Sequence, residues 1–410
     1  MTAVVTGLGV AAPNGLGIET FWSRTLDGVG VVGPITRFDA SDYPIRLAGE
    51  IVGFDDAAHI PGRLLPQTDR GTRFALAATD WALADAAADP AGFDHFDLGV
   101  VTAGSIGGFE FGQRELQALW HDGPEHVSVY QSFAWFYAVN TGQISIRHDM
   151  RGPTGVLVGE QAGGLDALAQ ARRRVRGGTR LVVTGGMEAP LCPWGVAGHV
   201  TNGRTSRSVD QDRAYLPFDV AANGYVIGEG GAMLIVEDLE QARRRDVPQV
   251  YGEIAGYAAT FDPPAGTGPV GTGPAGGSRL RQAITGALAD ARMSAADVDV
   301  VFADASGVAE LDRTEAQAIG EVFGSRAVPV TAPKTMFGRL SSGGGPVDVA
   351  AALMSLRDSV IPPTVNVGDL APGCDLDLVR EARPGPLSSA LVLARGHHGF
   401  NSAIVLRAVA

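Results

Sequence analysis

The segment from Val156 to Gly178 combines a short strand, a tight turn and a helix, an arrangement that often carries a catalytic nucleophile. It reads VLVGEQAGGLDALAQARRRVRGG, with the turn between Gly159 and Gly164. Many enzymes place a cysteine or serine at the tip of such a turn, beside the N-terminus of the helix. Here the tip residue is Gln161, and a primary amide is not a useful nucleophile. The segment therefore predicts the support of a catalytic site without its reactive group.

No other stretch supplies an obvious reactive centre. The sequence has no G-x-S-x-G, no H-E-x-x-H and no His/Cys cluster at metal-ligand spacing, so no metal site is expected. Its two cysteines, Cys192 and Cys374, form neither a disulfide framework nor a zinc site. Cys192 lies next to Pro193 and could in principle be a nucleophile, although a lone cysteine in such a place is more often a packing residue.

The composition is that of a globular chain in a reducing compartment. Of the 410 residues, 45% are hydrophobic and 19% are charged, which allows a large core. The net charge of -13 disfavours nucleic acid and anionic membranes as partners. No apolar run approaches the length of a membrane span, and the first residues read as a buried strand rather than a signal peptide. We therefore expect a cytoplasmic protein.

Short apolar runs alternate with alanine-rich stretches along the whole chain. The runs are continuous, which indicates strands buried on both faces and covered by helices. The expected strands are Ala3–Thr6, Leu98–Thr102, Val156–Val158, Leu181–Thr184, Ala232–Val236, Val250–Ala255, Val298–Phe302, Val328–Thr331, Ala390–Ala394 and Ala403–Arg407. The expected helices are Gly71–Ala87, Leu165–Arg176, Ser278–Ala291, Thr314–Val322 and Pro346–Arg357. This order predicts a layered α/β architecture.

Two halves of comparable content are expected, an N-terminal half over residues 1–240 and a C-terminal half over residues 247–410. The sequence shows no strong internal repeat, so the similarity of the halves is inferred from the order of the elements alone. The Gly/Pro-rich stretch Phe261–Ser278 lies early in the second half, and we expect it to form a surface loop.

Two longer stretches resemble the β-ketoacyl synthases of the thiolase superfamily. VVTGLGVAAPNG, which begins at Val4, is similar to their first strand and turn. LPFDVAANGYVIGEGGAMLIVED, which spans Leu216–Asp238, is similar to their mid-chain signature. The resemblance covers essentially the whole chain. It implies a thiolase-like fold of α-β-α-β-α layers built from two similar halves.

Active members of that family carry a cysteine at the strand-to-helix turn and two histidines in later segments. In this sequence all three are replaced, by Gln161 in GEQAGG, by Asp304 in DASGVAELDRTE and by Arg339 in PKTMFGR, which keeps Lys334. Asp304 and Arg339 have opposite charges, and a lone buried charge is costly. We therefore expect these two side chains to face each other or to be bridged by a neighbour such as Lys334.

This pattern of replacement resembles the chain length factors, the ketosynthase beta subunits of bacterial aromatic (type II) polyketide synthases. SFAWFYAVNTGQISIRH and IPGRLLPQTD are similar to that subfamily as well. The resemblance implies a noncatalytic subunit of a β-ketoacyl synthase (acyltransferase) complex in antibiotic or pigment biosynthesis. Its partner would be an active ketosynthase alpha subunit in a heterodimer. Substrate would arrive on the phosphopantetheine arm of an acyl carrier protein, with no cofactor bound by this chain.

GGFEFGQRELQALW predicts a helix from about Phe109 to Trp120. Phe109, Gly112, Gln113, Leu116 and Trp120 recur at three- and four-residue spacing and share one face, which could be an ordinary core face. The resemblance implies instead that Phe109, Gly112 and Leu116, together with Trp194, wall the end of a polyketide tunnel. Because Gly112 has no side chain, we expect a deep tunnel and a longer, decaketide-like product.

The residues at the degenerate site are consistent with a loss of condensing activity. Claisen condensation needs a thiolate that holds the acyl chain and donors that stabilise an enolate. Gln161 cannot hold the chain, and an ionised Asp304 opposes the enolate. One alternative is decarboxylation of malonyl-acyl carrier protein through Gln161, although ketosynthase-like domains proposed to work that way keep their histidines. A second alternative, a synthase that uses Cys192, has no histidine partner.

Overall fold

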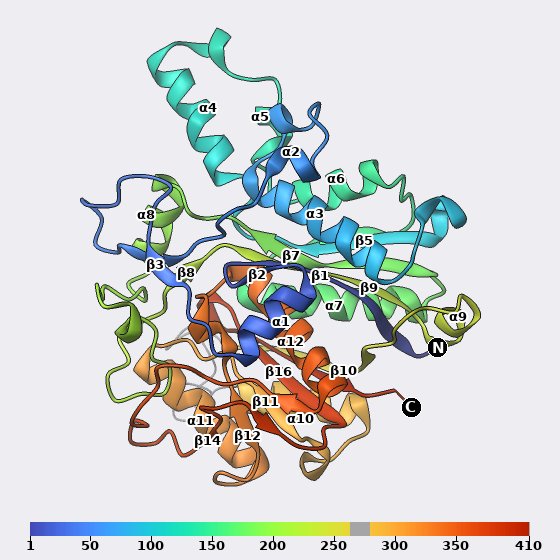
Figure 1. Ribbon diagram of the computed structural model, residues 1–410, viewed down its shortest axis with the longest axis vertical. Helices are drawn as coiled ribbons and strands as arrows, with labels where there is room; N and C mark the ends of the chain where they lie inside the picture. The colour runs from blue at the N-terminus through green and yellow to red at the C-terminus, as the bar shows by residue number, and fades with distance from the viewer. Residues whose placement is uncertain (263–278, 410) are drawn as a thin grey trace, which may run out of the picture.

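The computed structural model describes residues 1–262 and 279–409, and its dominant element is a 12-stranded mixed sheet. The strands follow the order β14-β12-β11-β16-β17-β10-β1-β9-β7-β5-β6, and β2 pairs with β1 off this path (Figure 1). Their bounds are β1 Ala3–Ala12, β2 Gly15–Leu16, β5 Leu98–Ala103, β6 Thr154–Leu157, β7 Leu181–Glu188, β9 Gly230–Asp238, β10 Gly252–Phe261, β11 Val300–Phe302, β12 Pro329–Thr331, β14 Asp377–Leu378, β16 Ser389–Arg395 and β17 Phe400–Arg407. All ten predicted strands are therefore confirmed, with shifted ends.

The sheet consists of two stretches with the same strand order and directions. In the first, β1-β9-β7-β5-β6, the first three strands are antiparallel and the last pairs are parallel. The second, β10-β17-β16-β11-β12, repeats this pattern. A short antiparallel contact, Val4 with Glu253 and Val5 with Gly252, joins β1 to β10. The same pattern of strand pairing thus occurs twice in the sheet.

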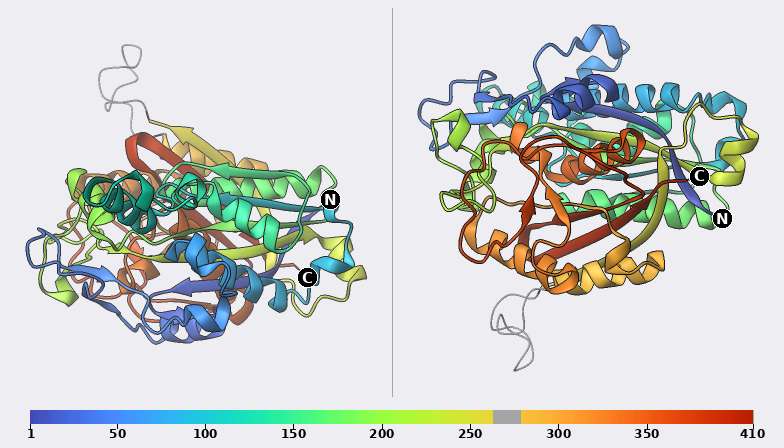
Figure 2. Two further views of the ribbon diagram at one scale, coloured as in Figure 1. Left: turned by 90° about the horizontal axis from the view of Figure 1, so that it is seen from above. Right: turned by 60° about the horizontal axis from the view of Figure 1, so that its bottom comes forward.

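Helices separate and cover these two stretches of sheet. Helices α7 (Gln161–Arg176) and α12 (Gly344–Asp358) lie between them and contact strands of both. Helix α3 (Arg70–Asp85) covers the outside of the first stretch, and α10 (Leu280–Ala291) covers the outside of the second (Figures 1 and 2). Helix α11 (Ala309–Phe323) packs against α10 on that side. This is the predicted thiolase-like α-β-α-β-α arrangement.

Two elements start or end elsewhere than predicted because their glycines allow close packing. Strand β1 continues past Thr6, and a Cβ atom at Gly7 or Gly9 would lie 2.1 or 1.8 Å from a backbone oxygen of α3. Helix α7 begins at Gln161 rather than Leu165, and a Cβ atom at Gly164 would lie 2.3 Å from Pro346 Cδ of α12. In both places glycine marks a close approach of backbones rather than a turn.

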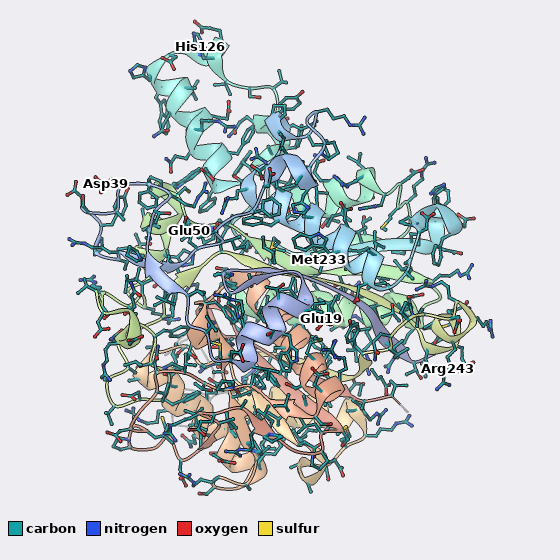
Figure 3. The ribbon with its side chains drawn as sticks, in the orientation of Figure 1. Glu19, Asp39, Glu50, His126, Met233 and Arg243 are labelled. Carbon is teal, nitrogen blue, oxygen red and sulfur yellow. The ribbon has the colours of Figure 1, made fainter. Side chains whose placement is uncertain are left out.

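A lobe of short helices projects from the first half, at the top of Figure 1. It contains α4 (Phe109–His121), which packs on α5 (Gln131–Ala134) and α8 (Pro193–Thr201). Figure 3 shows His126 beyond the end of α4, far from Met233, which is buried on β9. The helix predicted at Phe109–Trp120 is confirmed and extends one residue further.

The remaining elements are short. They are α1 Ile18–Leu26, β3 Val32–Pro34, β4 Leu47–Gly49, α2 Asp56–His59, α6 Val139–Arg147, β8 Ile227–Gly228, α9 Leu239–Arg244, β13 Val360–Ile361 and β15 Arg383–Pro384. Within residues 1–262 and 279–409, no helix has the length and apolar character needed to cross a membrane. Of the predicted loop Phe261–Ser278, residues 263–278 lie outside the described residues.

Candidate functional site

The turn between β6 and α7 has the backbone conformation of a nucleophile support. Glu160, directly before Gln161, has φ 51° and ψ -135°, a combination that is costly for any residue with a side chain. Its N–H donates to Ser105 Oγ at 3.0 Å, and its carbonyl accepts from Gly163 at 3.0 Å. The sharp turn predicted from the sequence is therefore present, and the strain in it is retained although its tip carries no nucleophile.

Gln161 points into the protein rather than toward an opening. Its side chain is completely buried, and neither amide atom has a hydrogen-bond partner among the described residues. The amide lies against the start of α12, where a Cβ atom at Gly344 would be 2.6 Å from Gln161 Oε1. The glycine of α12 thus makes room for a side chain larger than cysteine.

Asp304 and Arg339 form a buried ion pair. Arg339 Nη2 lies 3.0 Å from Asp304 Oδ1, and both residues are almost fully buried. Asp304 follows β11, and Arg339 follows a short 3-10 turn, Pro333–Met336, so two distant segments supply the pair. The prediction that the two replacements face each other is confirmed. The Asp304 carboxylate also accepts from the Arg395 N–H at 2.9 Å, which satisfies a second lone pair.

The Arg339 guanidinium has further partners that sequence reasoning missed. Its Nε lies 3.5 Å from Glu160 Oε1, its Nη2 donates to the Arg395 carbonyl, and its plane lies 5.9 Å from the Tyr225 ring centre. Burial disfavours the charge, but Asp304 and Glu160 outweigh burial and hold the Arg339 pKa well above its usual value. Glu160 and Tyr225 lie in the segments GEQAGG and LPFDVAANGYVIGEGG. The sequence therefore pointed to these segments but not to the contact of either residue with Arg339.

Burial alone would raise the pKa of Asp304, but the charges of Arg339 and Lys334 lower it below its ordinary value. Asp304 is therefore an anion that Arg339 neutralises. Such a pair offers neither a free general base nor a donor for a developing enolate.

Lys334 is not needed as a bridge, because Asp304 and Arg339 are in direct contact. Its Nζ lies 2.7 Å from Asp348 Oδ2 of α12 and donates to the carbonyls of Ala303 and Asp304 at 2.7 and 3.1 Å. Lys334 therefore contacts Asp304 through the backbone and bridges to α12. Glu315 completes this frame, because its carboxylate accepts from the N–H groups of Asp304 and Ala305 at 2.7 and 2.9 Å.

One cavity borders the ion pair, and a second borders the neighbouring Glu160. The smaller has a volume of about 290 Å³ and includes Asp304 and Arg339 in its wall. The larger has a volume of about 590 Å³ and includes Phe109 in its wall. Both share Glu160, Arg204, His397 and Phe400. Gln161 lines neither of them, so the position that would hold an acyl chain in an active enzyme is closed off here.

Three of the four predicted chain-length residues, Phe109, Gly112 and Trp194, lie together. Phe109 of α4 and Trp194 of α8 stack with ring centres 4.8 Å apart, and Gln113 Oε1 accepts from the Trp194 N–H at 2.7 Å. Gly112 lies beneath them, while Leu116 is half-buried one turn further along α4. Gln113 and Trp194 are 81 positions apart in the sequence, so the fold brings two distant segments together here.

Gly112 does not face open space, and the deep tunnel and longer product stay predictions. A Cβ atom there would lie 3.2 Å from Trp194 Cζ3 and 3.3 Å from Trp135 Cβ, so two tryptophans already occupy the space beside it. The glycine allows Trp194 to lie flat against α4. The depth of any tunnel at this place therefore depends on the position of Trp194 and not on Gly112 alone.

The other nucleophile candidate is inert. Cys192 is buried, and burial raises the pKa of its thiol to about 11, so it is protonated at neutral pH. His199, the imidazole closest in sequence, is half-buried, and its loss of solvation lowers its pKa to about 4. Cys192 accepts from the Gly195 N–H and caps the start of α8, which is a structural role.

The layered fold and the strained turn define a thiolase-like protein whose nucleophile position carries an unreactive side chain. Two family models match the chain: the β-ketoacyl synthase N-terminal domain over residues 2–242 and the C-terminal domain over residues 251–368. The chain therefore belongs to the β-ketoacyl synthase family.

Known proteins of this family are similar along their full length. The tetracenomycin polyketide synthase ketoacyl synthase beta subunit of Streptomyces glaucescens is 59% identical, over 98% of each chain. Among solved structures, a type II polyketide synthase acyl-carrier protein complex with its ketosynthase bound to the hexaketide matches with TM-score 0.87 and 27% identity, covering 100% and 99% of the two chains. A β-ketoacyl synthase from Burkholderia phymatum matches with TM-score 0.90 and 25% identity, over 100% of both chains.

Proposed function

We propose that this chain is the noncatalytic beta subunit of a type II polyketide synthase, a chain length factor that pairs with an active ketosynthase alpha subunit. The observation that carries the proposal is the buried Asp304–Arg339 ion pair, at 3.0 Å, in the place of two catalytic histidines. With Gln161 in place of the cysteine and the ion pair in place of the two histidines, these three positions carry neither a thiolate nor an imidazole. The 59% identity to a ketoacyl synthase beta subunit supports the same function.

An unpaired sheet edge supports the heterodimer. Strand β6 ends the sheet path, its residues are exposed or half-buried, and Val158 just beyond it is 55% exposed. An exposed edge strand is a site for pairing with another chain. In a pair of similar subunits, the two β6 strands can lie side by side about a pseudo-twofold axis and extend the sheet.

Exposed aromatic side chains of the first half support a large interface. Trp135, Phe136, Tyr137 and Trp194 are each between 38 and 42% exposed, and Trp120 is 77% exposed. Such a group of apolar side chains is costly in water and typical of an interface core. The partner that we propose would cover it.

We infer that chain-length control acts where the partner binds. Phe109, Leu116 and Trp194 belong to the lobe of α4, α5 and α8, and Phe109 lines the 590 Å³ cavity. A chain that grows from the partner's cysteine would meet this wall. The substrate would be delivered on the phosphopantetheine arm of an acyl carrier protein, and the cytoplasmic location stays a prediction.

The geometry does not favour decarboxylation through Gln161. The amide would have to reach a thioester carbonyl, but it is completely buried and lies outside the lining of both cavities. The two groups that would assist, at positions 304 and 339, neutralise each other.

The test of this function is the product profile of the reconstituted heterodimer with carrier protein and malonyl units. Leu116→Phe adds an aromatic ring to the half-buried face of α4, so we expect products shorter by whole two-carbon units. Gly112→Phe must displace Trp194 as well, and overpacking of this kind costs about 1–3 kcal/mol of stability. Its folding therefore has to be measured before its products.

The matched control is Gln117→Phe, because Gln117 follows Leu116 on α4 but is exposed on another face. This variant should give the original products. If folded Leu116→Phe and Gly112→Phe heterodimers both make unchanged chain lengths, α4 is not the wall and the proposed function fails at that point.

A further inference from the structure

The loop that leads into α4 is short and tightly packed. It comprises residues 104–108, between the end of β5 and Phe109. Gly107 has φ 67°, and a Cβ atom on it would lie 2.3 Å from the Trp135 carbonyl oxygen. At Gly108 a Cβ atom would lie 2.2 Å from the Ala134 carbonyl oxygen. The loop therefore has little room to change its conformation, and a displacement of its first residues would also displace Phe109.

Ser105 lies at that start and is held from three directions. Its N–H donates to Glu188 Oε1 at the end of β7, at 2.6 Å. Its Oγ lies 2.7 Å from Ser342 Oγ, which precedes α12. The same Oγ accepts from the Glu160 N–H at 3.0 Å. The segments that meet at Ser105 are 55, 83 and 237 residues away in the sequence.

Through Glu160, this serine is connected to the degenerate site. The Glu160 backbone, in its strained conformation, donates to Ser105, while the Glu160 side chain lies 3.5 Å from Arg339 Nε. Arg339 is fixed in turn by Asp304 at 3.0 Å. A continuous set of polar contacts thus runs from the replaced catalytic positions to the loop that carries Phe109.

We propose that Ser105 is a positioning residue that fixes the loop before α4 against the degenerate turn and thereby sets where the chain-length wall stands. This proposal rests on the proposed function, because it assumes that Phe109 belongs to that wall. On this proposal, the turn before α7 has a structural role in this chain. Without a nucleophile, the strained Glu160 peptide still offers an N–H to Ser105.

The experiment is the product profile of the full heterodimer with Ser105→Ala, with carrier protein and malonyl units supplied. The substitution removes both Oγ contacts and leaves the backbone bond to Glu188. We expect the ratio of minor to major chain lengths to change about fivefold, which corresponds to about 1 kcal/mol. Ser105→Thr keeps a hydroxyl and should restore the original ratio. A merely structural serine would lower the melting temperature without moving this ratio.

The control is Ser389→Ala, because Ser389 is buried on β16 and its Oγ also makes two contacts with backbone, far from α4. It should leave the ratio unchanged. If Ser105→Ala prevents assembly, Ser342→Ala is the second test of the proposal. It removes one of the two Oγ contacts of Ser105, so the ratio of chain lengths should shift in the same direction by a smaller amount. An unchanged ratio in the assembled Ser105→Ala or Ser342→Ala heterodimer, with Leu116→Phe still shortening the products, overturns the role of Ser105 alone. If Leu116→Phe changes nothing either, the wall itself is misplaced.

Discussion

Arg339 satisfies acceptors from three separate segments of the chain. They are the Asp304 carboxylate after β11, the Glu160 carboxylate at the turn before α7, and the Arg395 carbonyl at the end of β16. The planar guanidinium, with its five donors, suits such a place better than an ammonium group. The replaced histidine position has therefore become a structural junction.

Replacement of Arg339 by alanine should destabilise the subunit strongly. The change leaves the buried Asp304 carboxylate and the half-buried Glu160 carboxylate without their cation. Breaking a buried pair by removing one partner costs about 3–5 kcal/mol. Urea denaturation gives the free energy of unfolding. The control is Arg326→Ala, because the Arg326–Asp375 pair is 3.8 Å long and both side chains are more than half exposed, so its loss should cost about 0–1 kcal/mol.

A double-mutant cycle tests the physical reason. In an Asp304→Ala background, Arg339→Ala should cost clearly less than in the original chain, because the carboxylate that it leaves behind is already absent. Equal costs in both backgrounds would mean that Arg339 contributes through packing rather than through its charge.

Sequence reasoning predicted part of this site. The resemblance implied that positions 304 and 339 converge, and the opposite charges of Asp304 and Arg339 then predicted their contact, since buried charges need partners. The roles of Ser105, Glu160 and Glu188 were not predicted. Ser105 and Glu188 contact each other across 83 positions, and a single serine or glutamate carries no spacing pattern that would mark it. Only the fold shows that these residues meet.

The end of strand β7 carries a carboxyl group that should make stability depend on pH. Glu188 is buried and accepts from the N–H groups of Ser105 and Ile106 through one oxygen. Burial raises its pKa from 4.5 to about 7. The folded chain therefore keeps a proton that the unfolded chain loses between these values. The contribution of Glu188 to stability is complete below about pH 4.5 and is lost as the pH rises to about 7.

Glu188→Gln removes this titration and keeps an oxygen that can accept both N–H bonds. The free energy of unfolding of the variant, relative to the original chain, should rise by about 3 kcal/mol between pH 4.5 and pH 7.5. Urea denaturation at several pH values measures it. Glu240→Gln serves as the control, because Glu240 is 65% exposed on α9, and its difference should stay flat. A flat difference for Glu188→Gln would show that this carboxyl is not the titrating group.

At the scale of elements, apolar runs predicted the strands well, and glycines caused most of the errors. β5 and β16 were located nearly to the residue because their runs are continuous. The predicted β1 ends before Gly7, the first of two glycines at which the backbone of α3 lies close to the strand. Helix α8 was not predicted, because its sequence PWGVAGHVT holds a proline and two glycines and has little periodicity. The close packing that these glycines allow cannot be read from one segment alone.

At the scale of the whole molecule, partner binding should depend on the β6 edge. Val158→Lys places a charge beside that edge, where Val158 is 55% exposed in the free chain. If the partner covers it, the buried charge should weaken the heterodimer at least about tenfold, or about 1.4 kcal/mol. Co-purification with a tagged alpha subunit and size-exclusion chromatography measure this.

Val209→Lys is the matched control, because Val209 is 73% exposed in a loop away from β6. It should leave assembly unchanged. If Val158→Lys assembles as well as the original chain, the partner binds elsewhere. The boundary between residues 1–240 and 247–410 also stays a prediction, to be tested by expressing the two halves separately.

The pairing of β1 with β9 has a consequence for the order of events during synthesis. Ala3 pairs with Asp238, so the first strand waits for its main neighbour while the intervening residues are made, roughly 10 to 50 s at typical rates of translation. The second half repeats this delay, because Glu253 pairs with Arg407 near the end of the chain. The edge strand β6 belongs wholly to the first half. The surface that we assign to the partner is therefore complete while the ribosome is still translating the second half, and the two subunits can meet before this chain is finished.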